Sequence, residues 1–379
     1  MSEKPTVAHC ANPFLTLTMV WCYDQIRGLS RYRPVVLTQA RQNERVFPVE
    51  TLYSSEDLPP LRRSVNRVIR KIRGTYAGYV GILQEELAAV IHAHFGQEGY
   101  FCLAARRGAG VPMVTTFYGM DASALPRKRL WRRRFQRLFR EGELFLVEGP
   151  RMGESLVSIG CPYEKVQVHR LGVDLERIRK APPEGRQEAV VLMYANFREK
   201  KGHVYGLRAC RRILGSYPGM KVRIIGDGEL RAEVEREIQR LGIEERVELL
   251  GVLPHEKCLE ELGRASVLLY PSVTAADGDT EGGAPVALIE AMASGLAIVS
   301  SLHADIPTVA PDSECALLFP ERDVDGLAGG LDALLRSSRL REEMGTAGRA
   351  HVEDAHDMRK QAVRLETLYD RVRFQAKSG

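Results

Sequence analysis

Short runs of apolar residues recur along the chain and alternate with stretches in which apolar positions follow helical spacing. Such runs of four to six residues are typical of strands in parallel sheets that helices cover on both faces. Because two series of this kind follow one another, we expect an α/β fold of two doubly wound, Rossmann-like domains. The expected strands are 7–10, 35–38, 90–93, 113–117 and 145–147, then 190–194, 222–226, 247–251, 267–270 and 297–300.

A polar stretch rich in proline and glycine lies near the middle of the chain and marks the expected domain boundary. We place this linker at residues 178–188, with an N-terminal acceptor domain at 1–180 and a C-terminal donor domain at 187–355. A helical stripe of apolar residues in 356–379 predicts a last helix that packs back on the N-terminal domain. Open parallel sheets bind ligands at the carboxyl ends of their strands, so we expect the site in a cleft between the two domains.

Composition and charge narrow the class of protein. Of 379 residues, 44% are hydrophobic and 27% charged, which excludes wholesale disorder. No apolar run approaches the ~18 residues of a membrane span, and no leader pattern opens the chain, so we expect a cytoplasmic protein, at most peripheral on the inner face of the cell membrane. Seven scattered cysteines without a Cys-x-x-Cys pair indicate neither a zinc site nor a disulfide framework. The formal charge is +11 over residues 1–180 and −6 over the rest, which predicts different partners for the two halves.

The segment 270–295 carries the densest set of candidate site residues. Its polar loop runs through Glu281, Gly282, Gly283, Ala284 and Pro285. We expect Pro285 to be the first residue of a helix, whose free amides suit an anion or sugar hydroxyls. Glu290 is the only charge on this apolar helix, so it is either a buried structural group or a carboxylate that accepts hydrogen bonds from a ligand.

This segment resembles the Glu-x(7)-Glu signature of retaining GT-B glycosyltransferases of the family 4 type, which includes bacterial polysaccharide and lipopolysaccharide assembly enzymes. Further stretches match the family in its order along nearly the whole chain: Ile91-His-Ala-His-Phe-Gly, Thr116-Phe-Tyr-Gly-Met-Asp121, His169-Arg-Leu-Gly-Val-Asp174, Arg198-Glu-Lys-Lys201-Gly-His and Ile225-Gly-Asp-Gly-Glu. The resemblance implies a GT-B fold and transfer of a sugar from a nucleotide-diphosphate sugar to a saccharide or lipid-linked acceptor. The setting it implies is exopolysaccharide, capsule or lipopolysaccharide assembly.

The resemblance also implies a role for each matching residue. Glu281 would hold the donor sugar, Glu290 the ribose hydroxyls and Lys201 the diphosphate. The acceptor would lie near Tyr118 and Asp121. The implied donor-binding set is Asn196, Arg198, Lys201, Gly282, Gly283, Ala284, Pro285 and Glu290, and the implied catalytic set is Glu281, Lys201, Tyr118 and Asp121.

Three positions depart from the family pattern. Eight residues rather than seven separate the two glutamates, which predicts a bulged loop at Gly282 and Gly283. Asn196 stands where the family has arginine, and Arg198 is a candidate substitute for the lost charge. Tyr118 replaces a histidine, and because an ordinary tyrosine stays protonated near neutrality, we expect no protein general base. The resemblance implies front-face transfer, in which a donor phosphate oxygen takes the acceptor proton and the protein positions the substrates.

Other motifs carry competing interpretations. The Asp-Gly-Asp sequence ending at Asp279 imitates a metal site, but the resemblance implies diphosphate binding without a metal. No cofactor is expected beyond the nucleotide-diphosphate sugar as co-substrate. The turn at Gly226 begins like a dinucleotide fingerprint, yet Arg231 stands where the third glycine is needed, which argues against NAD. His92 and His94 are expected to be structural rather than substrate contacts.

Two N-domain segments account for the basic charge of that half. Residues 61–73 and 127–140 place apolar residues at helical spacing among six and eight basic residues, respectively. Basic amphipathic helices bind anionic membrane surfaces, but the same pattern also fits a surface helix packed inward with solvated arginines. Both interpretations stay open. No recognised motif for nucleic acid accompanies the patch, so no nucleic-acid partner is expected.

The sequence therefore predicts a retaining, hexosyltransferase-type glycosyltransferase. Two alternatives remain. One is a nucleotide-sugar hydrolase or epimerase on the same fold. The other is a catalytically weak scaffold in a polysaccharide assembly complex, which the substitutions at Asn196 and Tyr118 would allow.

Overall fold

The chain folds into two compact units. The computed structural model describes residues 4–182, 186 and 189–378. Unit 1 comprises Met1–Gly172 and Met358–Gly379, and unit 2 comprises Val173–Asp357. Residues 183–185 and 187–188 of the expected linker lie outside the described residues.

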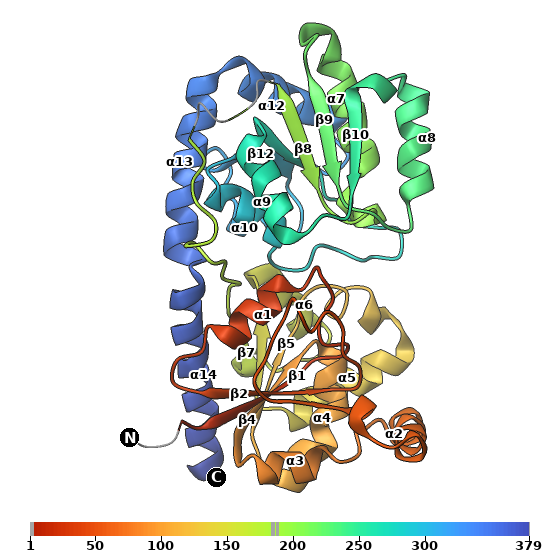
Figure 1. Cartoon of the computed structure of the whole chain (residues 1–379), viewed down its shortest axis with the longest axis vertical. Helices are drawn as coiled ribbons and strands as arrows, with labels where there is room; N and C mark the ends of the chain where they lie inside the picture. Colours follow the sequence, from red (N-terminus) through yellow and green to blue (C-terminus); the bar gives the residue numbers. More distant parts are fainter. Residues whose placement is uncertain (1–3, 183–185, 187–188, 379) are drawn as a thin grey trace. The chain divides into compact units, whose positions relative to one another are not determined.

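Unit 1 is built on a seven-stranded parallel sheet in the order β3-β2-β1-β4-β5-β6-β7 (Figure 1). Its strands are β1 Thr6–Cys10, β2 Arg33–Thr38, β3 Leu52–Ser54, β4 Ala88–His94, β5 Met113–Thr116, β6 Leu144–Val147 and β7 Val166–Val168. Its helices are α1 Val20–Arg27, α2 Pro60–Arg73, α3 Tyr79–Glu85, α4 Gly96–Ala109, α5 Arg129–Glu141, α6 Pro150–Ser158 and α14 Met358–Ser378. The strand order runs outward from β1 on one side and from β4 on the other, which is the order of a doubly wound sheet.

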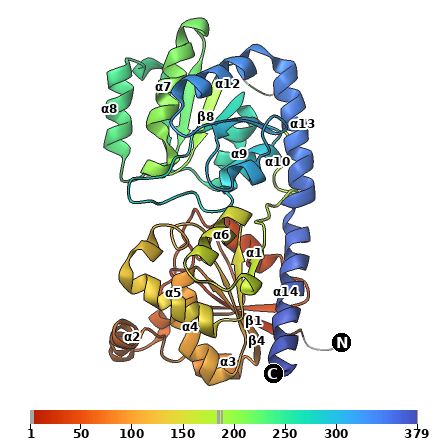
Figure 2. The same cartoon turned by 180° about the vertical axis from the view of Figure 1, so that it is seen from behind.

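The two faces of this sheet are covered by different helices. Side chains of a strand alternate between the faces. In β1, Ala8 joins the core cluster that includes residues of α3, α4 and α5 (Figure 2), whereas Val7 joins a cluster with Leu365 and Tyr369 of α14. The last helix of the chain therefore supplies part of the core of unit 1.

Charged residues of α14 also bind the segment before β2. The buried Glu366 accepts hydrogen bonds through Oε1 from the backbone N–H groups of Ser30 and Arg31, both at 2.6 Å. Asp370 accepts from the Tyr32 hydroxyl at 2.7 Å. A buried carboxylate is tolerated at position 366 because backbone donors satisfy it.

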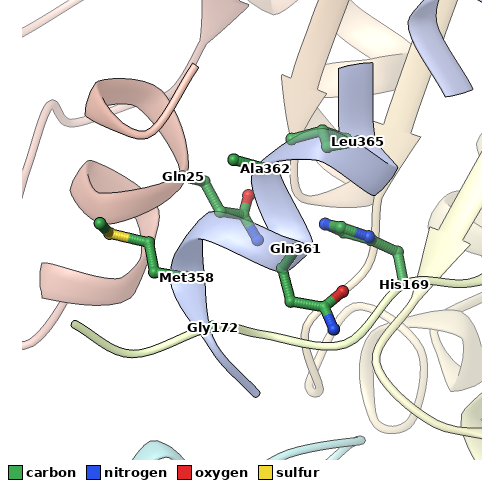
Figure 3. Close-up of a pocket in the computed structure, with 7 residues that line it drawn as sticks. All are labelled: Gln25, His169, Gly172, Met358, Gln361, Ala362 and Leu365. Atoms are coloured by element: carbon green, nitrogen blue, oxygen red, sulfur yellow. The ribbon is translucent and has the colours of Figure 1, made fainter. Parts of the chain in front are cut away.

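A small cavity lies where α14 meets α1 (Figure 3). Its volume is about 10 Å³, and its lining residues are Gln25, His169, Gly172, Met358, Gln361, Ala362 and Leu365. Burial lowers the pKa of His169 to about 4, so this ring is neutral at pH 7. A cavity of this size has room for about one water molecule and is far too small for a nucleotide sugar.

Unit 2 is built on a six-stranded parallel sheet in the order β10-β9-β8-β11-β12-β13. Its strands are β8 Val190–Tyr194, β9 Lys221–Ile225, β10 Val247–Gly251, β11 Val267–Tyr270, β12 Ala297–Ser301 and β13 Ala316–Phe319. Its helices are α7 His203–Ile213, α8 Arg231–Leu241, α9 His255–Arg264, α10 Val286–Ala293, α11 Ile306–Val309, α12 Val324–Arg336 and α13 Ser338–Ala355. The strand order again runs outward from a central pair, here β8 and β11.

The predicted α/β fold with two doubly wound domains is confirmed. Ten of the thirteen strands in the described residues coincide with expected runs, and the three that the pattern missed are β3, β7 and β13. All three lie at sheet edges, where strands are short and partly exposed. β3 and β7 include polar residues, whereas β13 is an apolar run, Ala-Leu-Leu-Phe, that the prediction overlooked. Among the described residues, no helix is long and apolar enough to cross a membrane.

Candidate active site

The loops that leave β8 and β11 lie side by side at the carboxyl edge of the unit 2 sheet. Val273 donates its backbone N–H to the carbonyl of Lys200 at 2.9 Å, which joins the two loops. Gly202 has φ +63°, and a Cβ at this position would lie 1.9 Å from the carbonyl oxygen of Pro271. Glycine is therefore required at position 202 for the two loops to approach this closely.

Lys201 and Glu281 form an ion pair at this edge. Nζ of Lys201 lies 2.6 Å from Oε2 of Glu281 and 2.6 Å from the Tyr270 hydroxyl, and Ser272 donates to Oε1 of Glu281 at 2.6 Å. The Glu281 side chain is 3% exposed. Burial by itself raises the pKa of Glu281, but the positive charges of Lys201 and Lys200 outweigh it and lower that pKa. Glu281 is therefore a carboxylate at neutral pH, held beside a cation.

The Asp-Gly-Asp sequence is engaged within the same loop. Lys200 Nζ lies 3.0 Å from Oδ2 of Asp279 and donates to the carbonyl of Thr280 at 2.8 Å. Asp277 accepts from the backbone N–H of Asp279 at 2.8 Å. These two carboxylates thus serve the loop's own contacts.

The loop after Glu281 leads into α10, and here one expectation needs correction. The helix begins at Val286, not at Pro285, because Pro285 has ψ 112°, which is extended, and occupies the cap position. Gly282 has φ +76°, a left-handed conformation that glycine adopts without strain and that accommodates the extra residue of this chain. Gly283 and Ala284 are buried beside it. Leu288 in the first turn of α10 donates its N–H to the carbonyl of Pro285 at 3.0 Å. The N–H groups at the very start of a helix, here those of Val286 and Ala287, lie at the end where an anion can bind.

Glu290 lies on α10 with a side chain that is 4% exposed. Its Oε1 is 2.6 Å from Nε2 of His255, the first residue of α9. Its Oε2 is buried and has no hydrogen-bond partner among the described residues. An unsatisfied buried oxygen costs about 1–3 kcal/mol, so Glu290 has an acceptor available for a ligand hydroxyl.

Asn196 and Arg198 lie in the loop after β8, and both side chains are exposed. Phe197 between them is buried, and its N–H donates to the carbonyl of Asp227 at 3.0 Å. Among the described residues, no hydrogen bond or ion pair joins either side chain to Lys201 or Glu281. The structure thus brings Lys201 and Glu281 together and leaves Asn196 and Arg198 on the solvent side of their loop.

Asp121 lies after β5 in unit 1 and is buried. Its Oδ1 accepts from the backbone N–H groups of Tyr118 at 3.0 Å and Gly119 at 2.9 Å, and its Oδ2 accepts from Gly96 at 2.8 Å. Burial raises the pKa of Asp121, although these amides oppose the shift. Both carboxylate oxygens are used by the backbone, so Asp121 fixes the shape of the loop that carries Tyr118.

Tyr118 ends a chain of hydrogen bonds between buried rings. Its hydroxyl lies 2.6 Å from Nδ1 of His94, and Nε2 of His94 lies 3.0 Å from Nδ1 of His9. Burial lowers the pKa of His94 to about 3 and raises the pKa of Tyr118 well above its ordinary value. Both groups are therefore neutral at pH 7, and Tyr118 keeps its proton.

His9, His92 and His94 form a buried cluster. Their ligand atoms lie within 4.8 Å of one another, a spacing that could hold a metal ion. Hydrogen bonds already engage these rings. His92 contacts the hydroxyls of Tyr369 at 2.6 Å and Thr116 at 2.7 Å, and Nε2 of His9 is the one ring nitrogen of the cluster with no hydrogen-bond partner among the described residues. The contacts of His92 and His94 are those of structural histidines.

The structure adds four residues to the site that sequence reasoning missed. They are Lys200, His255, Tyr270 and Ser272. Tyr270 and Ser272 carried a signal, because they stand at the end of an expected strand, where site residues gather. His255 carried no such signal, because it follows β10, whereas Glu290 lies on the helix that follows β11.

Comparisons with known proteins show the family of the chain. The profile of Glycosyltransferase Family 4 matches residues 18–177, and that of Glycosyl transferases group 1 matches residues 174–351. WcaL of Escherichia coli (strain K12), named as a glycosyltransferase of colanic acid biosynthesis, is 35% identical over 74% of this chain and 69% of its own. The amylovoran biosynthesis glycosyltransferase AmsK of Erwinia amylovora is 35% identical over 70% of this chain and 66% of its own.

Solved structures share the fold. The Anabaena protein Alr3699/HepE, crystallised with UDP and glucose, has a TM-score of 0.78 at 16% identity and covers 96% of this chain and 98% of its own. The lipopolysaccharide outer core galactosyltransferase WaaB in its apo form has a TM-score of 0.67 at 16% identity, over 95% of this chain and 99% of its own.

Two doubly wound domains of this kind define the class of GT-B glycosyltransferases. Within that class, the chain belongs to the glycosyltransferase family whose two domains are the family 4 and group 1 domains. It is a glycosyltransferase.

Proposed function

We propose that the protein is a retaining glycosyltransferase that moves a sugar from a nucleotide-diphosphate sugar to a saccharide or lipid-linked acceptor in exopolysaccharide assembly. Its relatives WcaL and AmsK are named for the biosynthesis of two such polymers. The observation that carries the proposal is the Lys201–Glu281 pair, which lies in the loop before α10, while Glu290 on α10 keeps one acceptor oxygen available.

Each group has a chemical task in this proposal. Lys201 supplies a positive charge to the diphosphate, and the first-turn amides of α10 supply further donors. Glu281 accepts hydrogen bonds from donor-sugar hydroxyls, and Glu290 accepts them from the ribose. Gly282, Gly283 and Ala284 leave room for the sugar, and Pro285 sets the start of the helix. Asn196 and Arg198 face the phosphates from the loop after β8.

The transfer step follows from the neutral groups of unit 1. Tyr118 keeps its proton, and both oxygens of Asp121 are engaged by backbone amides, so neither acts as the base. We propose that the bond from the sugar C1 to the phosphate oxygen breaks while the acceptor oxygen bonds to C1 on the same face. A phosphate oxygen takes the acceptor proton. The protein contributes positioning and stabilises the leaving diphosphate.

We also propose that transfer requires no metal ion. Lys200 and Lys201 supply positive charge at the site, and the carboxylates of Asp277 and Asp279 serve the loop itself.

The test combines ligand binding with product analysis. Thermal unfolding with UDP, GDP, ADP, CDP or TDP should show a rise in Tm with the correct nucleotide, since a ligand of the native state stabilises it by about 2.7 kcal/mol at a hundred times its Kd. Lys201→Ala and Glu290→Ala should each lower transfer by roughly a hundredfold or more while leaving the fold intact. The exposed Lys257→Ala is the matched control and should transfer normally, as should the wild type in EDTA.

Three results would count against this proposal. Full transfer by both Lys201→Ala and Glu290→Ala would overturn the site. Release of free sugar or of an epimerised nucleotide sugar, with no dependence on an acceptor, would favour the hydrolase or epimerase alternative. Absence of any donor turnover would favour the scaffold.

We further propose that α2 binds the protein to an anionic membrane surface. The helix has no buried residue, and its apolar side chains are largely exposed: Leu61 78%, Val65 48%, Val68 54% and Ile72 77%. Six basic residues and no acidic one share this helix. In α5, by contrast, Phe135, Leu138 and Phe139 are buried, so most of its apolar face is used by the core. This difference favours residues 61–73 over 127–140 as the membrane contact.

A further inference from the structure

His303 contacts the candidate site from the strand next to it. It follows β12, and its side chain is 1% exposed. Its Nε2 lies 3.1 Å from the backbone nitrogen of Glu281, and its Nδ1 lies 2.6 Å from Oε1 of Glu321. A backbone N–H can only donate, so Nε2 is the acceptor, and the ring proton is on Nδ1, where it donates to Glu321. The hydrogen bonds therefore select one neutral tautomer.

Glu321 is in turn held by the loop after β11. It follows β13, and its two oxygens accept from the N–H of Thr274 at 2.8 Å and from the Thr274 hydroxyl at 3.0 Å. Arg322 lies 3.2 Å from the same carboxylate. Burial by itself raises the pKa of Glu321, but the hydrogen bonds from Thr274 and His303 outweigh it and lower that pKa. The proton on Nδ1 of His303 thus faces a carboxylate, which holds the ring in the tautomer that accepts from Glu281.

The loop around Glu281 is held at several points before this residue, among them the N–H of Ala275, which donates to the carbonyl of Asp279 at 3.0 Å. Two glycines follow Glu281, and Gly282 is in the left-handed region. Before Glu281, the carbonyl of Thr280 accepts a hydrogen bond from Lys200. After Glu281, the next regular element is α10, which begins at Val286. The N–H of Gly282 donates to the Thr280 hydroxyl at 3.4 Å, and the N–H of Glu281 itself donates to His303, which is its hydrogen-bond partner among the described residues.

We propose that His303 is a positioning residue for sugar transfer. By holding the amide of Glu281, it sets where the Glu281 carboxylate lies relative to Lys201 and to the donor sugar. This inference rests on the proposed function of Glu281. Because Lys201 and Glu290 bind the nucleotide part, loss of the His303 contact should impair transfer far more than it impairs binding of a nucleoside diphosphate without a sugar.

Two substitutions separate the contacts of His303. In His303→Asn, the amide nitrogen can still donate to Glu321, as Nδ1 does, but the side chain is too short to accept from Glu281. In His303→Gln, the longer side chain places an amide oxygen where Nε2 stood. We expect His303→Asn to lower the kcat of transfer roughly ten- to a hundredfold, with an affinity for the nucleoside diphosphate that stabilises the wild type, UDP if it is UDP, within about twofold of the wild-type value. His303→Gln should recover most of the loss.

The outcomes are distinct. Wild-type kcat in His303→Asn would overturn the inference, and so would an equal loss of nucleoside diphosphate binding and kcat in both variants, which is the result for a general structural role. A crystal structure supplies a readout without activity: retention of the 2.6 Å Lys201–Glu281 contact in His303→Asn would also overturn it. If the wild type itself transfers no sugar, the proposed function fails, and the crystallographic arm still tests whether His303 places Glu281.

Discussion

At the residue scale, the candidate site consists of buried charges that each have specific partners. The Glu281 carboxylate is satisfied by Lys201 and Ser272, and the backbone N–H of the same residue donates to His303. A buried carboxylate without such partners would cost several kcal/mol or take up a proton. The partners therefore stabilise the charged carboxylate in the interior and also fix its orientation.

Glu98 on α4 is also a buried carboxyl group, but its partners stabilise the charged form much less than those of Glu281 do. Burial raises its pKa to about 7, while the Tyr76 hydroxyl, 2.8 Å from Oε2, and the charge of Arg70 oppose the shift only in part. The ordinary value is 4.5, so between about pH 4.5 and 7 the folded state binds the proton more tightly than the unfolded state. The stability that the proton contributes is present below this window and is lost as the pH rises through it.

Glu98→Gln tests this assignment, since glutamine keeps an acceptor for Tyr76 and cannot ionise. Near pH 5 the variant and the wild type should have similar free energies of unfolding, and at pH 8 the variant should be more stable by on the order of 3 kcal/mol. Urea denaturation at the two pH values measures the difference. The exposed Glu85→Gln on α3 is the control, and a Glu98→Gln effect that does not change with pH would contradict the assignment.

At the element scale, α2 and α5 show how one sequence pattern leads to two environments. Both helices combine an apolar stripe with many arginines. α5 buries three large side chains in the core of unit 1, whereas α2 buries none. An unburied apolar stripe flanked by cations is typical of a helix that lies on an anionic membrane.

The membrane proposal is tested with vesicles and one charge reversal on each helix. The wild type should sediment with vesicles that contain phosphatidylglycerol at low salt, and binding should weaken as salt rises. Arg67→Glu on α2 should weaken binding about tenfold or more, since each basic residue near such a surface contributes about 1 kcal/mol. Arg133→Glu on α5, also exposed, is the matched control. No binding at low salt, or an equal loss from both substitutions, would exclude α2 as the contact.

Among the described residues, prediction from the sequence succeeded for the nine inner strands and for the edge strand β10, and it failed for the other three edge strands, β3, β7 and β13. Nine of the ten expected runs are inner strands, and because both faces of an inner strand are covered, their sequences are mainly apolar. β7 at one edge reads Val-Gln-Val and is partly exposed, so its pattern does not differ from that of a loop. At α10 the pattern was wrong by one residue, because proline suits both the cap and the first helical position.

At the scale of the whole molecule, unit 1 is completed by the far end of the chain. Leu365, Tyr369 and Val372 of α14 are buried in one core cluster with strand residues of unit 1. Burial of three such side chains contributes several kcal/mol by the area removed from water. The core of unit 1 is therefore incomplete until the last residues are made.

Deletion of residues 358–379 should accordingly destabilise unit 1. We expect amide hydrogen exchange in β4 and β6 to speed up strongly while β8 and β11 keep their protection, because unit 2 has its own core cluster. Deletion of residues 375–379 is the control, since it leaves these three side chains in place. Unchanged protection of β4 in the longer deletion would contradict a structural role for α14.

The sequence by itself determined the features that depend on neighbours along the chain. Apolar periodicity predicted the sheets, and the resemblance of several motifs to the family 4 glycosyltransferases implied the family and the candidate site residues Glu281, Glu290 and Lys201. These signals are local, because strand and helix periods span only a few positions.

The tertiary structure alone decided which groups meet. Strand order places Lys201 beside Glu281, 80 residues later, and brings His303 and Glu321 from two further strands to the same loop. The fold also places backbone amides within hydrogen-bond distance of both oxygens of Asp121. It leaves every side chain of α2 at least partly exposed, whereas three side chains of α5 are buried. Such partners and burial depend on the crossing of distant segments, and no local pattern of residues encodes the distance between their side chains.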